Sequence, residues 1–217
     1  MLVHLVHSTN IKINYGFIQK GEKVKIMNDK IAIDVVLLLP QEIIDEAIKV
    51  NSKLNNDQIV LNNKNCLPHI SLCMGVVQKK DLPIVAKIIE NIASDTQRLN
   101  SELTGIKDYT AFDIRNNIQL QKLHEMLMNK LSQYLTYDAT VEMFYSSHLV
   151  EPKSLFWVNN YKDKFSFDNY YPHITLGVGK VEKKKMNLTF TASTVALCHI
   201  GNYCTCRKVL FTADLKK

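Results

Sequence analysis

A short motif that occurs twice places the strongest constraint on what this chain can fold into. Pro-His-Ile-Ser-Leu occupies residues 68–72, and Pro-His-Ile-Thr-Leu occupies residues 172–176, about half the chain away. A repeat at this separation is typical of an internal duplication, in which each half of the chain supplies one copy. The duplication predicts an α+β fold with two pseudo-symmetric lobes, each an antiparallel sheet with flanking helices, around a central cleft.

Each copy of the motif is predicted to lie in a strand, because apolar and polar residues alternate over residues 67–77 and 171–179. Residues i and i+2 of a strand point to the same face, so His69 pairs with Ser71 and His173 pairs with Thr175. The isoleucine and leucine residues of both motifs then face the hydrophobic core. If the lobes are related by symmetry, two imidazoles and two hydroxyls meet in the cleft.

This set of side chains suits a phosphodiester. A neutral imidazole can take the proton from an attacking water or ribose hydroxyl, and a protonated imidazole can give one to the departing oxygen. The ordinary pKa of histidine, about 6.5, permits both roles near neutral pH. The Ser71 and Thr175 hydroxyls can donate hydrogen bonds to the non-bridging phosphate oxygens. The scheme requires no metal, and it leaves open which histidine is the acid and which is the base.

The two segments resemble the signatures of the 2H phosphoesterase superfamily, in its 2′-5′ RNA ligase-like or cyclic phosphodiesterase branch. The resemblance covers about residues 31–215. It implies a bilobed, LigT-like fold, chemistry without a metal or other cofactor, and substrates that carry 2′,3′-cyclic phosphates or 2′-5′ linkages. It also implies that His69, His173, Ser71 and Thr175 are catalytic and that the two hydroxyl residues bind the substrate. Ser71 stands where threonine is commoner in the family, a change that keeps the hydroxyl.

The function that follows is a metal-independent phosphodiesterase acting on RNA ends or short nucleotides, with 2′-5′ RNA ligation as its reverse reaction. One alternative keeps the site and changes the substrate to 2′-5′ oligoadenylate or cyclic oligonucleotide signals. A second alternative, of another class, is a non-catalytic nucleotide- or RNA-binding module. The presence of all four motif residues favours an enzyme. The expected partner is RNA or a small nucleotide substrate, with no membrane and no obligate protein partner.

The rest of the chain is interpreted as one bilobed domain over residues 31–217, preceded by an N-terminal extension, residues 1–30, of unexplained role. The first lobe holds the motif at 67–72 and the second holds the motif at 171–176. A compact first unit is predicted to end before Asn116-Asn117. Strands are predicted over 31–39, 59–61, 67–77, 137–144, 154–159, 171–179, 188–200 and 203–213, with one or two more over 103–114. Helices are predicted over 41–54, 81–99 and 117–135.

Composition narrows the class of protein. The net charge of +6 has the sign that attracts phosphate-bearing ligands, although a solvated lysine-rich surface explains it equally well. The longest apolar run ends at Pro40 and is too short to cross a bilayer. The first fifteen or so residues lack the features of a signal peptide. Together these observations predict a soluble, cytoplasmic protein.

The five cysteines are an odd number, which favours free thiols over a disulfide framework. Cys198-His199 and Cys204-Thr205-Cys206 raise zinc as an alternative, but Cys-x-Cys spacing in a strand favours plain packing of both thiols on one face.

Several other residues receive weaker assignments. The remaining histidines, among them His124, are expected to be structural or on the surface. Lys183-Lys184-Lys185 is expected to be a solvated turn between strands, and only secondarily a contact to an RNA backbone. Tyr171 could stack on a base, but Pro172 disturbs the strand geometry and packing explains the aromatic residue at least as well, so it is left unassigned. Further candidates for contacts to a nucleobase or phosphate are Trp157, Tyr145 and Arg115.

Overall fold

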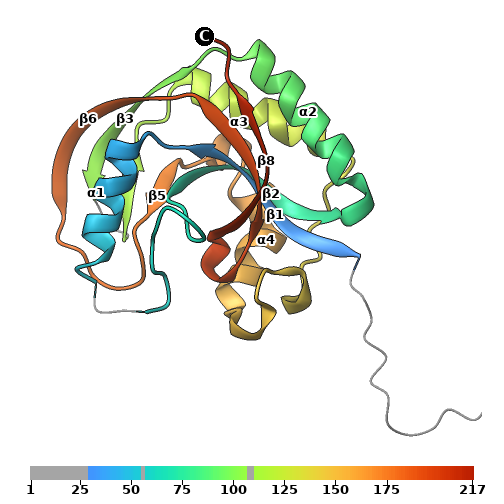
Figure 1. Ribbon diagram of the computed structural model, residues 1–217, viewed down its shortest axis with the longest axis horizontal. Helices are drawn as coiled ribbons and strands as arrows, with labels where there is room; N and C mark the ends of the chain where they lie inside the picture. Colours follow the sequence, from blue (N-terminus) through green and yellow to red (C-terminus); the bar gives the residue numbers. More distant parts are fainter. Residues whose placement is uncertain (1–28, 55–56, 107–109) are drawn as a thin grey trace, which may run out of the picture.

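The computed structural model describes residues 29–54, 57–106 and 110–217, which form eight strands and four α-helices (Figure 1). Most of the expected N-terminal extension, residues 1–28, lies outside the described residues. The strands are β1 (Lys30–Leu38), β2 (His69–Gln78), β3 (Leu99–Ile106), β4 (Ala111–Ile114), β5 (His173–Thr175), β6 (Lys184–Ala192), β7 (Thr194–Ile200) and β8 (Cys206–Asp214). The helices are α1 (Gln41–Asn51), α2 (Leu82–Asp95), α3 (Ile118–Leu131) and α4 (Pro152–Lys164).

The strands form two four-stranded sheets, in the orders β2-β1-β7-β8 and β5-β4-β3-β6. Every pairing within them is antiparallel, which confirms the predicted α+β fold. One motif strand lies at an edge of each sheet, β2 in the first and β5 in the second. The two sheets form the two lobes seen in Figure 1.

The two sheets do not correspond to two successive halves of the chain. Each contains two strands that precede Asn116-Asn117 and two that follow it, because β7 returns to pair with β1 and β6 returns to pair with β3. The prediction of a compact unit that ends before Asn116 is therefore wrong. Each sheet is therefore built from strands of both halves of the described chain, and each lobe needs both halves to form.

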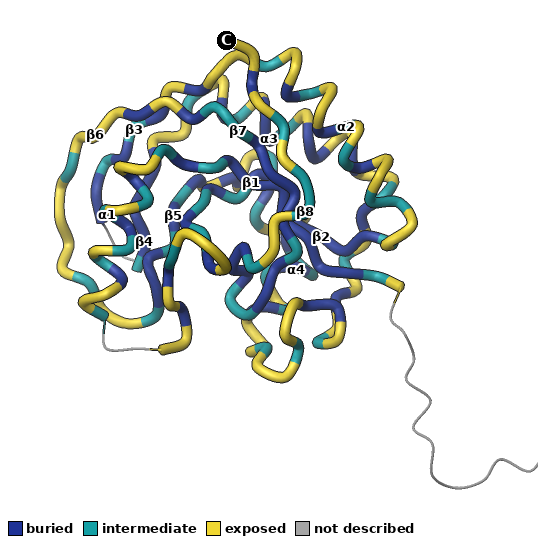
Figure 2. Tube along the Cα trace, viewed as in Figure 1, coloured by how far each residue is buried: buried dark blue, intermediate teal, exposed yellow. Residues whose placement is uncertain are grey.

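Three helices cover the first sheet. α2 packs on β7 and β8, while α3 and α4 pack on β2. The core-facing residues of these helices follow helical spacing, as Val85, Ile89 and Ala93 do on α2. In Figure 2 strands β1, β2 and β7 of this sheet are largely buried, whereas β6, at the edge of the second sheet, is exposed over most of its length.

Helix α1 is tied to the second motif by the buried Asn51. The Asn51 Nδ2 donates hydrogen bonds to the carbonyl oxygens of Ile59 and Leu176, at 2.7 and 2.8 Å, and its Oδ1 accepts one from the N–H of Leu61 at 2.9 Å. These bonds satisfy backbone groups of residues 59–61, which therefore do not need a partner strand. The short strand predicted there is absent.

Two further local predictions are wrong. Residues 154–159 belong to helix α4, whose buried Ser154, Val158 and Tyr161 have helical spacing and whose first turn begins at Pro152. Residues 137–144 contain a short 3₁₀ turn, Val141–Met143, and no strand. Lys184 and Lys185, predicted to lie in a turn, form the start of β6.

The cysteines also differ from expectation. Cys198 and Cys206 form a disulfide between the neighbouring strands β7 and β8, with their Cα atoms 5.6 Å apart, so the expectation of free thiols is wrong for this pair. Cys66, Cys73 and Cys204 are free and buried. Cys204 lies in a 3₁₀ turn, with its Sγ 3.8 Å from the carbonyl oxygen of Ser154, and not in the expected strand with Cys206. Two of the three thiols that the zinc alternative requires, Cys198 and Cys206, are therefore bonded to each other.

Candidate active site

The two motif strands, β2 and β5, contact each other across the two sheets. Both have the alternation that the sequence predicts. Ile70, Leu72, Ile174 and Leu176 are fully buried, while the histidines and hydroxyl residues of both motifs are partly exposed. The fold therefore brings the two polar motif faces, which are far apart in sequence, to neighbouring positions.

The two motif histidines are held in the same way. The Nδ1 of His69 lies 2.8 Å from the carbonyl oxygen of Leu67, and the Nδ1 of His173 lies 2.9 Å from the carbonyl oxygen of Tyr171. A carbonyl can only accept a hydrogen bond, so Nδ1 carries the proton in each ring. In the neutral form this leaves the lone pair on Nε2, the nitrogen that a reacting group would meet.

The two imidazoles also influence each other's charge. Burial lowers the pKa of His69 to about 4, the bond to the Leu67 carbonyl opposes that shift, and the positive charge of His173 lowers it further. Burial lowers the pKa of His173 as well, and the bond to the Tyr171 carbonyl and the nearby carboxylate of Asp113 oppose that shift. His69 is therefore neutral at physiological pH. The pKa of His173 is also lowered, but His173 is the ring that has an opposing carboxylate, Asp113, beside it.

A buried carboxyl group, Asp34, lies behind the first motif. It stands on β1, and its Oδ2 accepts a 2.5 Å hydrogen bond from the Ser71 hydroxyl and lies 3.7 Å from the Nε2 of His69. Sequence reasoning missed this residue. The signal was present, because Asp34 is the one charged residue within the apolar run from Ile31 to Leu39.

Burial raises the pKa of Asp34 to about 8, although hydrogen bonds from Ser71 and from the backbone of Cys73 and Leu72 act in the opposite direction. The carboxyl is therefore mostly protonated at pH 7. A protonated Asp34 can donate to the Ser71 oxygen, which leaves the Ser71 proton for a phosphate. An ionised Asp34 keeps the Ser71 proton and adds a negative charge where a phosphate would bind.

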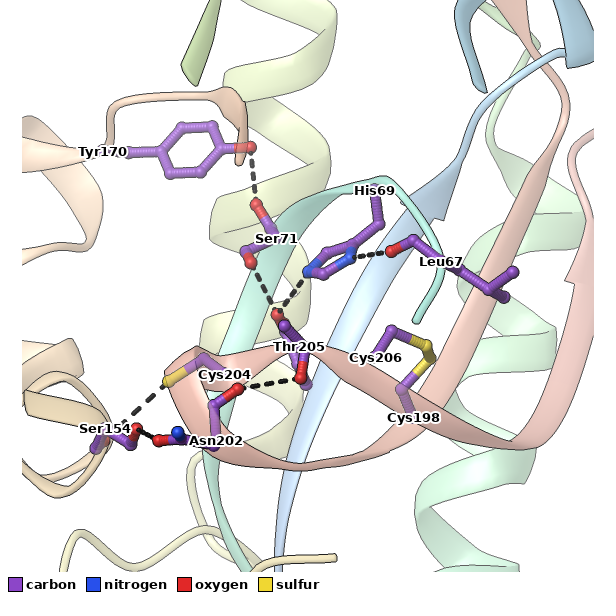
Figure 3. Close-up of polar contacts among 11 residues, drawn as sticks. Leu67, His69, Ser71, Ser154, Tyr170, Cys198, Asn202, Cys204, Thr205 and Cys206 are labelled. Atoms are coloured by element: carbon purple, nitrogen blue, oxygen red, sulfur yellow. Dashed lines mark hydrogen bonds and ion pairs between the residues drawn. A yellow bond between two sulfur atoms is a disulfide. The ribbon is translucent and has the colours of Figure 1, made fainter. Parts of the chain in front are cut away.

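Two aromatic residues brace the first motif from behind. The Tyr170 hydroxyl donates to the carbonyl oxygen of Ser71 at 3.0 Å, and Figure 3 shows this bond beside the His69 ring and its contact with Leu67. His124 bonds through Nδ1 to the carbonyl oxygen of Leu72 at 2.6 Å, accepts the N–H of Phe167 at Nε2, and stacks on Tyr170. His124 is fully buried, so its predicted structural role is confirmed.

The second motif has a different set of neighbours. Asp113 on β4 is the cross-strand partner of His173, and it accepts a hydrogen bond from the Tyr171 hydroxyl. The Tyr171 ring stacks against the His173 ring, with centroids 5.9 Å apart. Of the residues considered for contacts to a nucleobase or phosphate, Tyr171 is the one whose ring contacts a motif histidine.

The other three candidates lie in other contacts. Arg115 pairs with Glu102 through two hydrogen bonds of 2.7 and 3.0 Å. Trp157 lies beside Tyr203, and Tyr145 lies beside His199. Within the described ranges, no group of three or more His, Cys, Asp or Glu is arranged to hold a metal ion, and no helix is long and apolar enough to cross a bilayer.

The fold and the paired motifs define a class: a two-lobed α+β protein with the LigT-like fold. Among solved structures, this chain is similar to the Thermus thermophilus protein TT0787, with a TM-score of 0.53 and 12% identity over 85% of this chain and 98% of the other. It is also similar to E. coli LigT in complex with NADP+, with a TM-score of 0.52 and 13% identity over 88% of this chain and all (100%) of LigT. A structure described as a phosphoesterase gives a TM-score of 0.51 at 12% identity.

No protein-family model matches the sequence, and no curated protein matches it. At these identities the likeness shows the fold, and the chemistry depends on the residues described above.

Proposed function

We propose that this protein is a metal-independent 2H phosphodiesterase that acts on 2′,3′-cyclic phosphates or 2′-5′ linkages of RNA ends or short nucleotides. The observation that carries the proposal is the matched pair His69 and His173. Both rings have Nδ1 fixed to the carbonyl oxygen two residues earlier, they lie on strands in contact, and the charge of one lowers the pKa of the other. Two such imidazoles are what general acid and base catalysis of phosphoryl transfer requires.

In the proposed reaction the neutral His69 takes the proton from the attacking water, since its pKa of about 4 leaves Nε2 unprotonated. His173 is assigned the role of giving a proton to the departing ribose oxygen, because it is the motif histidine with a carboxylate, Asp113, beside it that opposes the effect of burial on its pKa. Ser71 and Thr175 donate hydrogen bonds to the non-bridging oxygens, where negative charge increases in the transition state. Proton transfer and charge stabilisation thus come from residues of this chain.

The structures of E. coli LigT with phosphate, 3′-AMP and ATP support a nucleotide as the ligand of this fold. The test is a substrate panel: 2′,3′-cyclic mononucleotides, RNA with a cyclic-phosphate end, 2′-5′ and 3′-5′ oligoadenylates, and cyclic dinucleotides. The position of the phosphate in each product is identified, and every reaction is run with and without excess EDTA. Hydrolysis of a cyclic phosphate or 2′-5′ bond that is undiminished by EDTA is the expected result.

The panel also separates the alternatives. Preference for 2′-5′ oligoadenylate or cyclic oligonucleotides would make this a signal-degrading enzyme with the same mechanism. Tight nucleotide binding without turnover of any substrate would make it a binding module and would contradict the proposal.

A further inference from the structure

The strand that carries the second motif is weakly held by its own sheet. Strand β5 has three residues, lies at an edge of the second sheet and pairs with β4 alone. A ladder this short supplies few hydrogen bonds. The first motif strand, β2, contacts β5 but belongs to the other sheet. The separation of His69 and His173 therefore depends on what fixes the chain on either side of β5.

His124, on α3, is bonded through its two ring nitrogens to both sides of the site. Its Nδ1 donates to the carbonyl oxygen of Leu72, on β2, at 2.6 Å, and its Nε2 accepts the N–H of Phe167 at 2.8 Å. A neutral imidazole has one donor and one acceptor, so this arrangement uses both and fixes one tautomer. Burial lowers the pKa of His124, which favours that neutral form. The ring therefore connects β2 with the segment that leads to His173.

Phe167 has a backbone conformation that its neighbours must hold. Its φ is +54°, in the left-handed region that bulky residues rarely adopt. His124 binds its N–H, and its carbonyl oxygen accepts hydrogen bonds from the Gln121 Nε2 and from the N–H of Tyr170, both at 3.0 Å. A strained conformation persists only where the surrounding structure holds it, and two of these three bonds come from α3. Helix α3 thus sets the direction in which the chain leaves Phe167.

Tyr170 links the same elements a second time. Its ring stacks on the His124 ring, with centroids 4.0 Å apart and planes 3° from parallel, and its hydroxyl donates to the carbonyl oxygen of Ser71 at 3.0 Å (Figure 3). His173 follows Tyr170 by three residues. Three residues span at most about 10 Å. The chain between this anchor on β2 and the second imidazole is therefore short.

We infer that His124 is a positioning residue, which together with Tyr170 sets the separation of the two motif histidines. This role rests on the proposed function and deepens it, because acid and base catalysis requires both imidazoles to reach one phosphate. His124 acts through the backbone of β2 and of residues 166–171 and does not touch the substrate. A misplacement of 1 Å in a catalytic site can lower the rate roughly 100-fold, so a small change at His124 should be seen in kcat.

Two conservative substitutions separate the two bonds of His124. H124N keeps an amide near the position of Nδ1, to bind the Leu72 carbonyl, and loses the bond to Phe167. H124Q keeps an amide oxygen near the position of Nε2, to accept the Phe167 N–H, and loses the bond to Leu72. Each should lower kcat for a 2′,3′-cyclic mononucleotide about 10-fold and leave KM within about threefold of wild type, because the phosphate-binding hydroxyls are unchanged. Y170F, which removes one hydroxyl, should lower kcat about threefold.

The matched control is H199N. His199 is a half-buried histidine whose Nε2 bonds to the carbonyl oxygen of Met143 at 2.9 Å, and it stands on β7, which pairs with neither motif strand. The control should melt at a lower temperature and keep the wild-type kcat. All rates are measured where thermal melting shows each variant to be folded. Folded H124N and H124Q with the wild-type kcat would overturn the positioning role and make His124 a stabilising residue alone.

A distance measurement tests the same role without turnover. Nitroxide labels on N169C and T212C, both at exposed sites, report the segment before His173 and strand β8 of the first sheet, and the three free cysteines are buried. Pulsed electron paramagnetic resonance should give one narrow distance distribution for the otherwise unchanged protein and for H199N, and a broader or shifted one for H124N, H124Q and Y170F. If no substrate is turned over but the His124 variants broaden the distribution, the proposed function fails and the link between the motifs stands. Turnover by wild type with unchanged distributions in the His124 variants would overturn the positioning role and leave the proposed function intact.

Discussion

The two motif strands carry the same chemistry in different surroundings. The first motif is enclosed: Ser71 bonds to the buried Asp34, and Tyr170 braces the strand from behind. The second motif is more open: β5 has only three residues, His173 has the carboxylate of Asp113 beside it, and the Tyr171 ring that stacks on His173 is exposed. A duplicated motif thus gives two imidazoles that are alike in tautomer and differ in the charged groups around them.

This difference teaches how a symmetric motif can support an asymmetric reaction. Acid and base catalysis needs one ring without a proton and one with a proton. Here the environments, and not the motif residues, separate the two roles: a neutral carboxyl lies near His69 and an anionic one lies near His173. Substitution of the residues that distinguish the two motifs tests how much of the difference between their environments the reaction requires.

The largest effect is expected from loss of either imidazole. His69→Ala and His173→Ala should each lower kcat at least about 100-fold, because each removes one proton-transfer group. The double variant should be little worse than either single one, since residues that act as a unit are not additive. His148→Ala, at an exposed site, is the control and should keep full activity. A single-histidine variant with near-normal turnover would contradict the mechanism.

A smaller effect, about 10- to 1000-fold, is expected from loss of either hydroxyl. Ser71→Ala and Thr175→Val should both melt normally. The two should differ in their pH dependence. Because the ionised Asp34 keeps the Ser71 proton, the cost of Ser71→Ala should shrink as the pH rises past about 8, the pKa of Asp34. The cost of Thr175→Val should not. Parallel pH profiles for the two variants would remove Asp34 from the argument.

A smaller effect is expected from loss of the carboxylate beside His173. Asp113→Asn removes the charge that raises the pKa of His173 and opposes the effect of burial. His173 should then lose its proton at lower pH, and the basic limb of the kcat/KM profile should move to lower pH. Asp34→Asn should not move that limb in the same direction. Movement of the limb by Asp34→Asn alone would reverse the proposed roles of the two histidines.

Sequence predicted the part of the site that rests on local periodicity. The alternation in both motifs placed His69, Ser71, His173 and Thr175 on polar strand faces, and the resemblance gave the two-lobed fold. It could not give Asp34 a role, because that role comes from strand pairing that joins β1 to β2. It also missed helix α4, where a run from Ser154 to Asn159 is short enough to fit either a strand or a helix.

The Cys198–Cys206 disulfide was missed for a related reason. The odd number of cysteines is a property of the whole chain and does not say whether one particular pair can bond. A disulfide depends on the distance between two Cα atoms, which the β7–β8 pairing holds 5.6 Å apart here. The role of Asp34 and the formation of the disulfide both follow from pairing between strands that are distant in sequence, and not from residue type.

The smallest expected effect is on stability, and it tests whether the carboxyl behind the first motif is neutral in the folded protein. The ordinary pKa of Asp34 is 3.8 and burial raises it to about 8, so between these values the folded state holds a proton that the unfolded state lacks. The stabilisation is complete below pH 3.8 and is lost as the pH rises toward 8, at about 1.4 kcal/mol per pH unit. Asn is neutral throughout and close in shape.

The unfolding free energy of Asp34→Asn relative to wild type should therefore increase with pH, by about 2 kcal/mol between pH 6.5 and 8. In this window His69, whose pKa is lowered to about 4, is unprotonated in the folded state of both proteins, so its titration in the unfolded state cancels from the difference between them. Chemical denaturation at four pH values measures the difference, with Asp214→Asn, on exposed β8, as the control that should show no such slope. A constant difference across the window would mean that Asp34 is already ionised at neutral pH. Ser71 would then bond to a carboxylate at every working pH, and the second motif alone would supply the hydroxyl that binds phosphate.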